Sequence, residues 1–196
     1  MKITIALLYD LRACSSGVMN VTDWGLIGLE HDAFIRECVE RNRFDYAVWL
    51  TVRLLKTSER RTKFAIFAAR QVLPIFEGLC PGDNRPRRAI VEAEDWFMDR
   101  LHMTEENAKA VVAAASLNAA DIPDIPDRTA ALAAAVSARN AARTAIASGV
   151  DSVPETDMAV VNAINAADYV GCIDVKRAII EFGIELINQG ERNEPE

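Results

Sequence analysis

The sequence predicts an all-α protein, either an irregular antiparallel helical bundle or a short α-solenoid of seven to nine helices. Three observations carry this prediction. Apolar residues recur at intervals of three and four in most segments, as on one face of a helix. Capping residues, prolines and glycines separate these segments by short loops, which make successive helices antiparallel neighbours. Seventeen alanines occur in the 40 residues 108–147, and alanine is the strongest helix former.

Residues 1–12 fit two kinds of secondary structure. The alternation of Ile3, Ile5 and Leu7 is typical of a strand, whereas Ile3, Leu7 and Leu11 fit one face of a helix. A short apolar run does not decide between these alternatives. We favour a helix, because the rest of the chain is helical and a lone strand would have no partner.

Three helices are expected in the next part of the chain, over residues 18–28, 32–41 and 46–55. The second carries Phe34 and Cys38 on one side. Asp45 is expected to cap the third, because aspartate accepts hydrogen bonds from the free backbone amides of a first turn. The third segment is apolar nearly all round, which predicts a central place in the core.

Two further helices are expected over residues 62–77 and 87–101. Residues 57–61 are polar and predict a turn. Residues 79–86 give the strongest loop signal in the chain, because they combine proline, glycine, aspartate and asparagine. Pro86 fits the first turn of the following helix, where its missing N–H leaves no hydrogen bond unmade.

The second half of the chain predicts an alanine-rich helix pair, over residues 104–120 and 128–148, followed by two more helices. Asp127 is expected to cap the second member of the pair, and Gly149 to end it. Ser152 and Glu155 have the spacing of a capping box and predict a helix through Tyr169. A last helix is expected over residues 174–188.

One helical domain over residues 1–196 is expected from the length, with a possible sub-boundary at residues 121–127. Residues 1–100 hold 15 basic and 14 acidic side chains, whereas residues 101–196 hold 7 basic and 15 acidic ones. A near-neutral N-terminal part therefore precedes an acidic C-terminal part. Asp121, Asp124 and Asp127 alternate with two prolines at the boundary, which predicts an extended loop.

Composition restricts the class of protein. The hydrophobic fraction of 51% excludes a disordered chain. The net charge of −7 disfavours a nucleic-acid-binding protein, because an acidic surface repels phosphate. The four cysteines are scattered, which predicts reduced thiols and a cytoplasmic protein. The sequence contains no apolar run of the roughly 18 residues that a transmembrane helix needs, so we expect none.

Catalytic and metal-binding patterns are sparse. His31 and Cys38 could share one helix face as a base and a nucleophile, but nothing in the sequence orients the histidine. Asp99 and His102 have the spacing of a metal-binding pair, which occurs once, whereas di-iron bundles need it twice. Glu92 shares a helix face with Asp99. We therefore expect no enzyme, no cofactor and no metal.

Two basic clusters, residues 60–63 and 85–88, could each contact a phosphate. Neither has the interleaved aromatic residues or the glycine-rich loop that nucleic-acid and nucleotide sites combine with basic residues. We expect no direct nucleic-acid contact. Arg87 and Arg88 are expected to be solvated, or Arg88 to pair with Glu92.

Several segments together resemble the putative immunity protein family of bacterial polymorphic toxin systems, which is also found in phage and prophage genomes. These segments are residues 11–14, 45–50, 85–93 and 166–169, joined by the alanine-rich helices. The junction of loop and helix at Asn84-Arg85-Pro86-Arg87 is the most specific of them. The resemblance implies an all-helical, cytoplasmic, non-catalytic protein that binds and neutralises a toxin.

The sequence therefore favours a binding protein that blocks a protein partner, either a toxin or, if the chain is phage-encoded, a bacterial defence nuclease. A nuclease has a basic groove, which an acidic face can occupy. Asp121, Asp124 and Asp127 are the first candidate contacts, because an extended loop displays them outward. The alternative is a metal- or small-molecule-binding helical-bundle enzyme using Glu92 and Asp95 near His102, and a weaker one is a phage assembly factor. The sequence leaves the partner and the oligomeric state open.

Overall fold

A computed structural model describes residues 1–98, 127–147 and 152–193 of the chain. Within these ranges the backbone forms nine helices and no strand, apart from one isolated bridge between Lys2 and Glu30. The prediction of an all-α fold is confirmed. The helices are α1 (Ile5–Asp10), α2 (Ser15–Asp23), α3 (His31–Glu40), α4 (Phe44–Leu54), α5 (Ser58–Leu79), α6 (Arg85–Met98), α8 (Arg128–Ile146), α9 (Ser152–Tyr169) and α10 (Ile173–Asn193).

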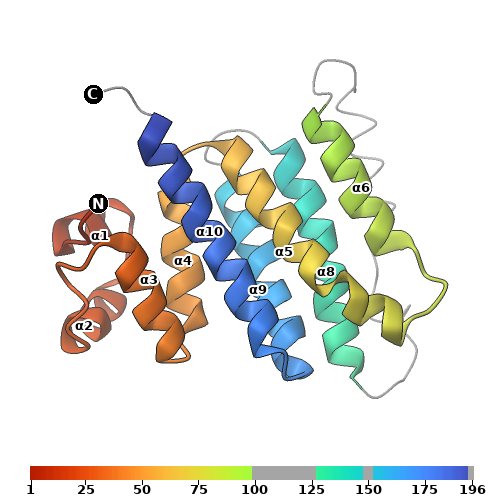
Figure 1. Ribbon diagram of the computed structural model, residues 1–196, viewed down its shortest axis with the longest axis horizontal. Helices are drawn as coiled ribbons and strands as arrows, with labels where there is room; N and C mark the ends of the chain where they lie inside the picture. The colour runs from red at the N-terminus through yellow and green to blue at the C-terminus, as the bar shows by residue number, and fades with distance from the viewer. Residues whose placement is uncertain (99–126, 148–151, 194–196) are drawn as a thin grey trace.

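The larger helices form two layers (Figure 1). One layer contains α3, α10, α5 and α6, and the other contains α4, α9 and α8. The order in space differs from the order in sequence, because α10 packs between α3 and α5, and α9 packs between α4 and α8. The C-terminal hairpin of α9 and α10 thus fills the centre of the molecule. Helices that precede and follow residues 121–127 share one hydrophobic core.

The N-terminal residues combine both of the structures that the sequence allowed. Thr4 accepts a hydrogen bond from the Leu7 amide at 3.1 Å and begins α1, so the favoured helix is correct for Ile5–Asp10. Ile3 is instead extended, and its backbone exchanges two hydrogen bonds of 2.8 Å with the Leu29 carbonyl and the Gly28 amide. The partner of this extended stretch is some 25 residues away, which local periodicity does not reveal.

The starts of several helices differ from the prediction. The turn expected at residues 57–61 is helical, because α5 begins at Ser58, directly after Thr57. Asp45 lies inside α4, and α9 begins at Ser152 itself. Asp127 does precede α8, but in a left-handed backbone conformation and without a side-chain capping bond. The Ser152 hydroxyl accepts a hydrogen bond of 2.6 Å from the buried Arg61 side chain.

Small residues set the closeness of packing in the middle of the molecule. α8 is buried along most of its length through alanine side chains, and its described neighbours are α5, α6 and α9. The helix expected at residues 104–120 lies outside the described residues. Gly183 of α10 lies where a Cβ atom would come within 2.5 Å of Thr51 Cγ2. Alanine and glycine thus allow approaches that larger side chains would prevent.

Every helix in the described ranges is too short or too polar to cross a lipid bilayer.

Candidate functional site

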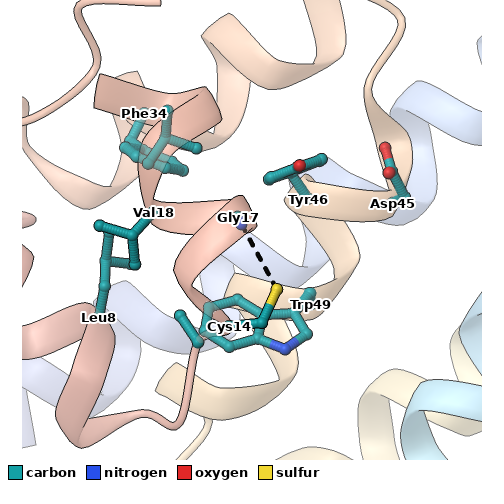
Figure 2. Close-up of a pocket in the computed structure, with 10 residues that line it drawn as sticks. Leu8, Cys14, Gly17, Val18, Phe34, Asp45, Tyr46 and Trp49 are labelled. Carbon is teal, nitrogen blue, oxygen red and sulfur yellow. Dashed lines mark hydrogen bonds between the residues drawn. The ribbon is translucent and has the colours of Figure 1, made fainter. Parts of the chain in front are cut away.

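An apolar hollow of about 270 Å³ lies between the first four helices (Figure 2). Each of α1 to α4 contributes to its walls, which are mostly aliphatic and aromatic. We call it the apolar hollow; its lining residues are Leu8, Ala13, Cys14, Gly17, Val18, Val21, Phe34, Asp45, Tyr46 and Trp49. Its size and lining suit one apolar side chain or a small apolar molecule.

The aromatic wall of the apolar hollow is held by contacts on its outer side. Asn20 of α2 donates a hydrogen bond of 2.7 Å to the Tyr46 hydroxyl. The Trp24 ring meets the Tyr46 ring edge-on, with centroids 5.1 Å apart. The Arg43 guanidinium lies over both rings, at 5.0 Å from Trp24 and 4.4 Å from Tyr46. These contacts fix the position of Tyr46 before any ligand or partner arrives.

Cys14 lies at the edge of the apolar hollow, where it precedes α2. Its Sγ atom is 3.3 Å from the Ser16 hydroxyl and accepts a hydrogen bond from the Gly17 amide at 3.4 Å, drawn in Figure 2. Both groups stabilise the thiolate, so they lower the pKa of Cys14 below its usual value. The side chain is exposed, and it is therefore accessible to reagents in solution.

The four thiols are expected to differ in reactivity. Cys14 and Cys172 are exposed and should react within minutes with a thiol reagent at neutral pH, whereas Cys38 and Cys80 should react only on unfolding. Burial raises the pKa of Cys38 to about 12, which keeps this thiol protonated. Replacing Ser16 by alanine should slow the reaction of Cys14 at pH 7, because it raises the thiol pKa. Mass spectrometry of alkylated peptides measures each rate.

A control fixes the interpretation of this experiment. In the Cys172→Ser variant a single fast thiol should remain, and its rate should rise with pH around a midpoint below that of a free cysteine. Fast labelling of Cys38 in the folded protein would contradict the burial described above.

A second hollow of about 200 Å³ lies on the other side of α4, towards α9 and α10. Its lining mixes polar and apolar groups, and we call it the polar hollow; its residues are Asn42, Phe44, Asp45, Val48, Val161, Ile164, Asn165, Asp168 and Lys176. Lys176 is buried there, donates to the Asp168 carboxylate at 2.5 Å and lies 4.4 Å from the centre of the Phe44 ring. Asp45 lines both hollows, so the first turn of α4 separates them.

Asp45 is ionised at neutral pH. Partial burial alone would raise its pKa, but two hydrogen bonds from Arg43, of 3.0 and 2.7 Å, lower the pKa below the usual value. The same bonds raise the pKa of Arg43. The Asp45 carboxylate between the two hollows therefore stays negatively charged at neutral pH.

The surroundings of His31 and Cys38 do not suit a catalytic base and nucleophile. His31 is buried, its Nε2 atom lies 3.0 Å from the Asn188 side-chain oxygen, and its Nδ1 atom lies 3.3 Å from the Met1 amino group. Cys38 is buried among apolar side chains with a raised pKa. A protonated thiol is a poor nucleophile, so the geometry disfavours a Cys–His catalytic pair.

The structure describes only some of the other candidate residues. Asp121, Asp124, Asp99 and His102 lie outside the described residues, and Asp127 is exposed at the start of α8. Among the residues that the structure describes, no cluster of three or more histidine, cysteine, aspartate or glutamate side chains could hold a metal ion.

The basic clusters are largely engaged in intramolecular contacts. Arg61 is buried and donates to the Leu55 carbonyl as well as to Ser152, and Lys63 pairs with Glu59 at 2.8 Å. Arg87 was expected to be solvated, but it pairs with Glu77 of α5 at 2.6 Å. Neither cluster therefore presents a continuous basic surface.

The sequence analysis did not predict that one side of α4 is only partly buried. The near-continuous apolar run predicted a fully central helix, yet Tyr46 and Trp49 are only partly buried and form one wall of the apolar hollow. The signal was present in their chemistry. Tyrosine and tryptophan have an apolar body and a polar edge, and they are common where a core meets a surface.

Comparison with known proteins gives one match. Residues 53–149, from the end of α4 through α8, match the family described as Imm-5 like putative immunity protein. No curated protein and no solved structure matches the chain. Of the segments that suggested the resemblance, residues 85–93 and the alanine-rich region lie inside the match, whereas residues 11–14, 45–50 and 166–169 lie outside it. The match over residues 53–149 supports an assignment to the Imm-5 like putative immunity protein family.

Proposed function

We propose that this chain is a non-catalytic antidote that binds and neutralises a protein toxin in the cytoplasm. The family match carries the proposal. The net charge of −7 supports it, because an acidic protein is steered to a basic partner such as a nuclease toxin. The four cysteines are free thiols, as is usual in a reducing compartment.

The acidic segment at residues 121–127 is a proposed contact for the toxin. Reversing Asp121, Asp124 and Asp127 to lysine together should weaken binding, most strongly at low salt, because charge attraction between exposed groups is screened as salt rises. The helical content, measured by circular dichroism, should not change. Unchanged affinity in the triple variant would exclude this segment as a contact.

The proposed function is tested with the products of the genes that flank the gene for this chain, each tried as the candidate toxin. Expressing that toxin alone should stop bacterial growth, and expressing it together with this chain should restore growth. In a purified assay the toxin activity should fall in proportion to the added chain and end near one equivalent, because a blocking protein acts by occupancy. Neutralisation by far less than one equivalent would instead indicate an enzyme and would refute the proposal.

A further inference from the structure

We propose that the two hollows beside α4, with Asp45 between them, form a docking surface for a basic protein partner. The partner presents a lysine or arginine side chain to the polar hollow and a neighbouring apolar side chain to the apolar hollow. This inference rests on the proposed function and identifies a surface through which that function would act, in addition to the proposed contact at residues 121–127. We call the two hollows and the Asp45 ridge the α4 surface.

The shape of the α4 surface suits two anchors. Asp45 lines both hollows, so the two hollows adjoin the same turn of α4. Hollows of about 270 and 200 Å³ are each large enough for one long side chain. Binding energy at protein interfaces is concentrated in a few side chains that fill such hollows and lose contact with water.

The negatively charged groups of the polar hollow are more exposed to solvent than its positively charged groups. Lys176 pairs with Asp168, and the lysine side chain is 7% exposed whereas the carboxylate side chain is 67% exposed. Arg43 pairs with Asp45, and here the exposed fractions are 36% and 62%. In both pairs the carboxylate lies nearer to the solvent than the cation does. An approaching partner therefore meets carboxylate oxygens first.

A carboxylate that is more exposed than its cation is not found in every ion pair of the described residues. The exposed pair of Arg36 and Glu181 has nearly equal exposed fractions, 49% and 48%. Asn42 and Asn165 also line the polar hollow, and each has a side-chain amide oxygen that can accept a hydrogen bond. Carboxylate and amide oxygens accept hydrogen bonds from ammonium and guanidinium groups, so a cation is the complementary occupant.

Apolar groups surround the polar hollow. Val161 lines it, and Met158 lies one helical turn earlier on α9; both are exposed. On the opposite side of the ridge, Trp49 and Tyr46 form the wall of the apolar hollow. A partner that covered these groups would exclude water from the ion pair at the centre, which strengthens the attraction between the charges.

The polar hollow is tested at Asn165, which lines this hollow and is exposed. Asn165→Arg places a cation where the partner's cation belongs, and it should weaken toxin binding about tenfold. Asn165→Asp should strengthen binding, mainly through faster association at low salt. Gln189→Arg is the matched control, because it adds the same charge at an exposed amide on α10 and should leave the affinity unchanged.

The apolar hollow is tested by filling it. In the Cys172→Ser variant, N-phenylmaleimide should alkylate Cys14: the thiolate adds to one alkene carbon and a proton from water adds to the other. The attached ring then occupies the hollow of the folded protein. Toxin affinity should fall about tenfold relative to the unlabelled variant, because the ring takes the place of the partner's apolar side chain.

The outcomes separate the surface from the function. If the unmodified chain neutralises the toxin but Asn165→Arg and the alkylated protein bind as tightly as it does, the α4 surface is refuted and the proposed function stands. If the unmodified chain does not bind the toxin, both fall. Thermal unfolding of each variant shows whether a loss of affinity reflects a loss of folding, and in that case the Asn165→Asp result decides.

Discussion

Gly183→Ala is expected to destabilise the protein by about 3 kcal/mol, which would lower the melting temperature by about 6–12 °C in a chain of this length. Gly183 lies on α10 where it crosses α4 and α5. An added Cβ atom would lie 2.5 Å from Thr51 Cγ2 and 3.0 Å from two ring atoms of Phe64. These neighbours are fully buried, so the helices must separate to admit one methyl group.

Two variants control this prediction, with stability measured by chemical denaturation. Gly78→Ala makes the same change in α5, where no atom beyond the adjacent residues and the nearby backbone of the helix itself lies within 4 Å of the added Cβ. It should stabilise by about 0.5–1 kcal/mol through helix propensity. Thr51→Ser removes the clashing methyl group but keeps the hydroxyl that donates to the Ala47 carbonyl. It should therefore recover part of the loss in the Gly183→Ala background. A neutral Gly183→Ala variant would contradict the close crossing.

Ala141→Leu is expected to destabilise by about 3 kcal/mol, the upper end of the usual range for overpacking. Ala141 is fully buried on α8 and belongs to a core cluster with Ala65 and Ala69 of α5 and Ala159 of α9. Three additional carbon atoms have no room between helices that pack through alanine side chains. The expected measurement is an earlier urea midpoint with little change in the slope of the transition.

The matched control for this substitution is Ala178→Leu, at an exposed position of α10. Leucine and alanine are both good helix formers, so this variant should remain within about 0.5 kcal/mol of the parent. If Ala141→Leu were equally mild, the close approach of α8 to α5 and α9 would be wrong.

Local patterns predicted the helices better than they predicted the packing. The helices expected over residues 32–41 and 46–55 occur as His31–Glu40 and Phe44–Leu54, because apolar spacing and turn residues determine helices locally. The pairing of Ile3 with Leu29 and the place of α9 and α10 depend on contacts between distant parts of the chain. Periodicity carries no information on such contacts.

The candidate surface was harder to predict than the fold. Asp45 was expected to be a capping residue, but its carboxylate binds Arg43 and separates two hollows. The polar hollow joins residues of α4 to residues of α9 and α10, which follow α4 by more than 100 residues in sequence. Only the folded arrangement reveals that the lysine beneath Asp168 is buried while the carboxylate is exposed.

The central position of the last hairpin has a consequence for synthesis on the ribosome. Because α10 packs between α3 and α5, a nascent chain that ends before residue 173 leaves those helices with an uncovered apolar face. The early helices must wait, protected or partly unfolded, until α10 has emerged from the exit tunnel. A chain interrupted before α10 has been synthesised would therefore be a substrate for proteolysis.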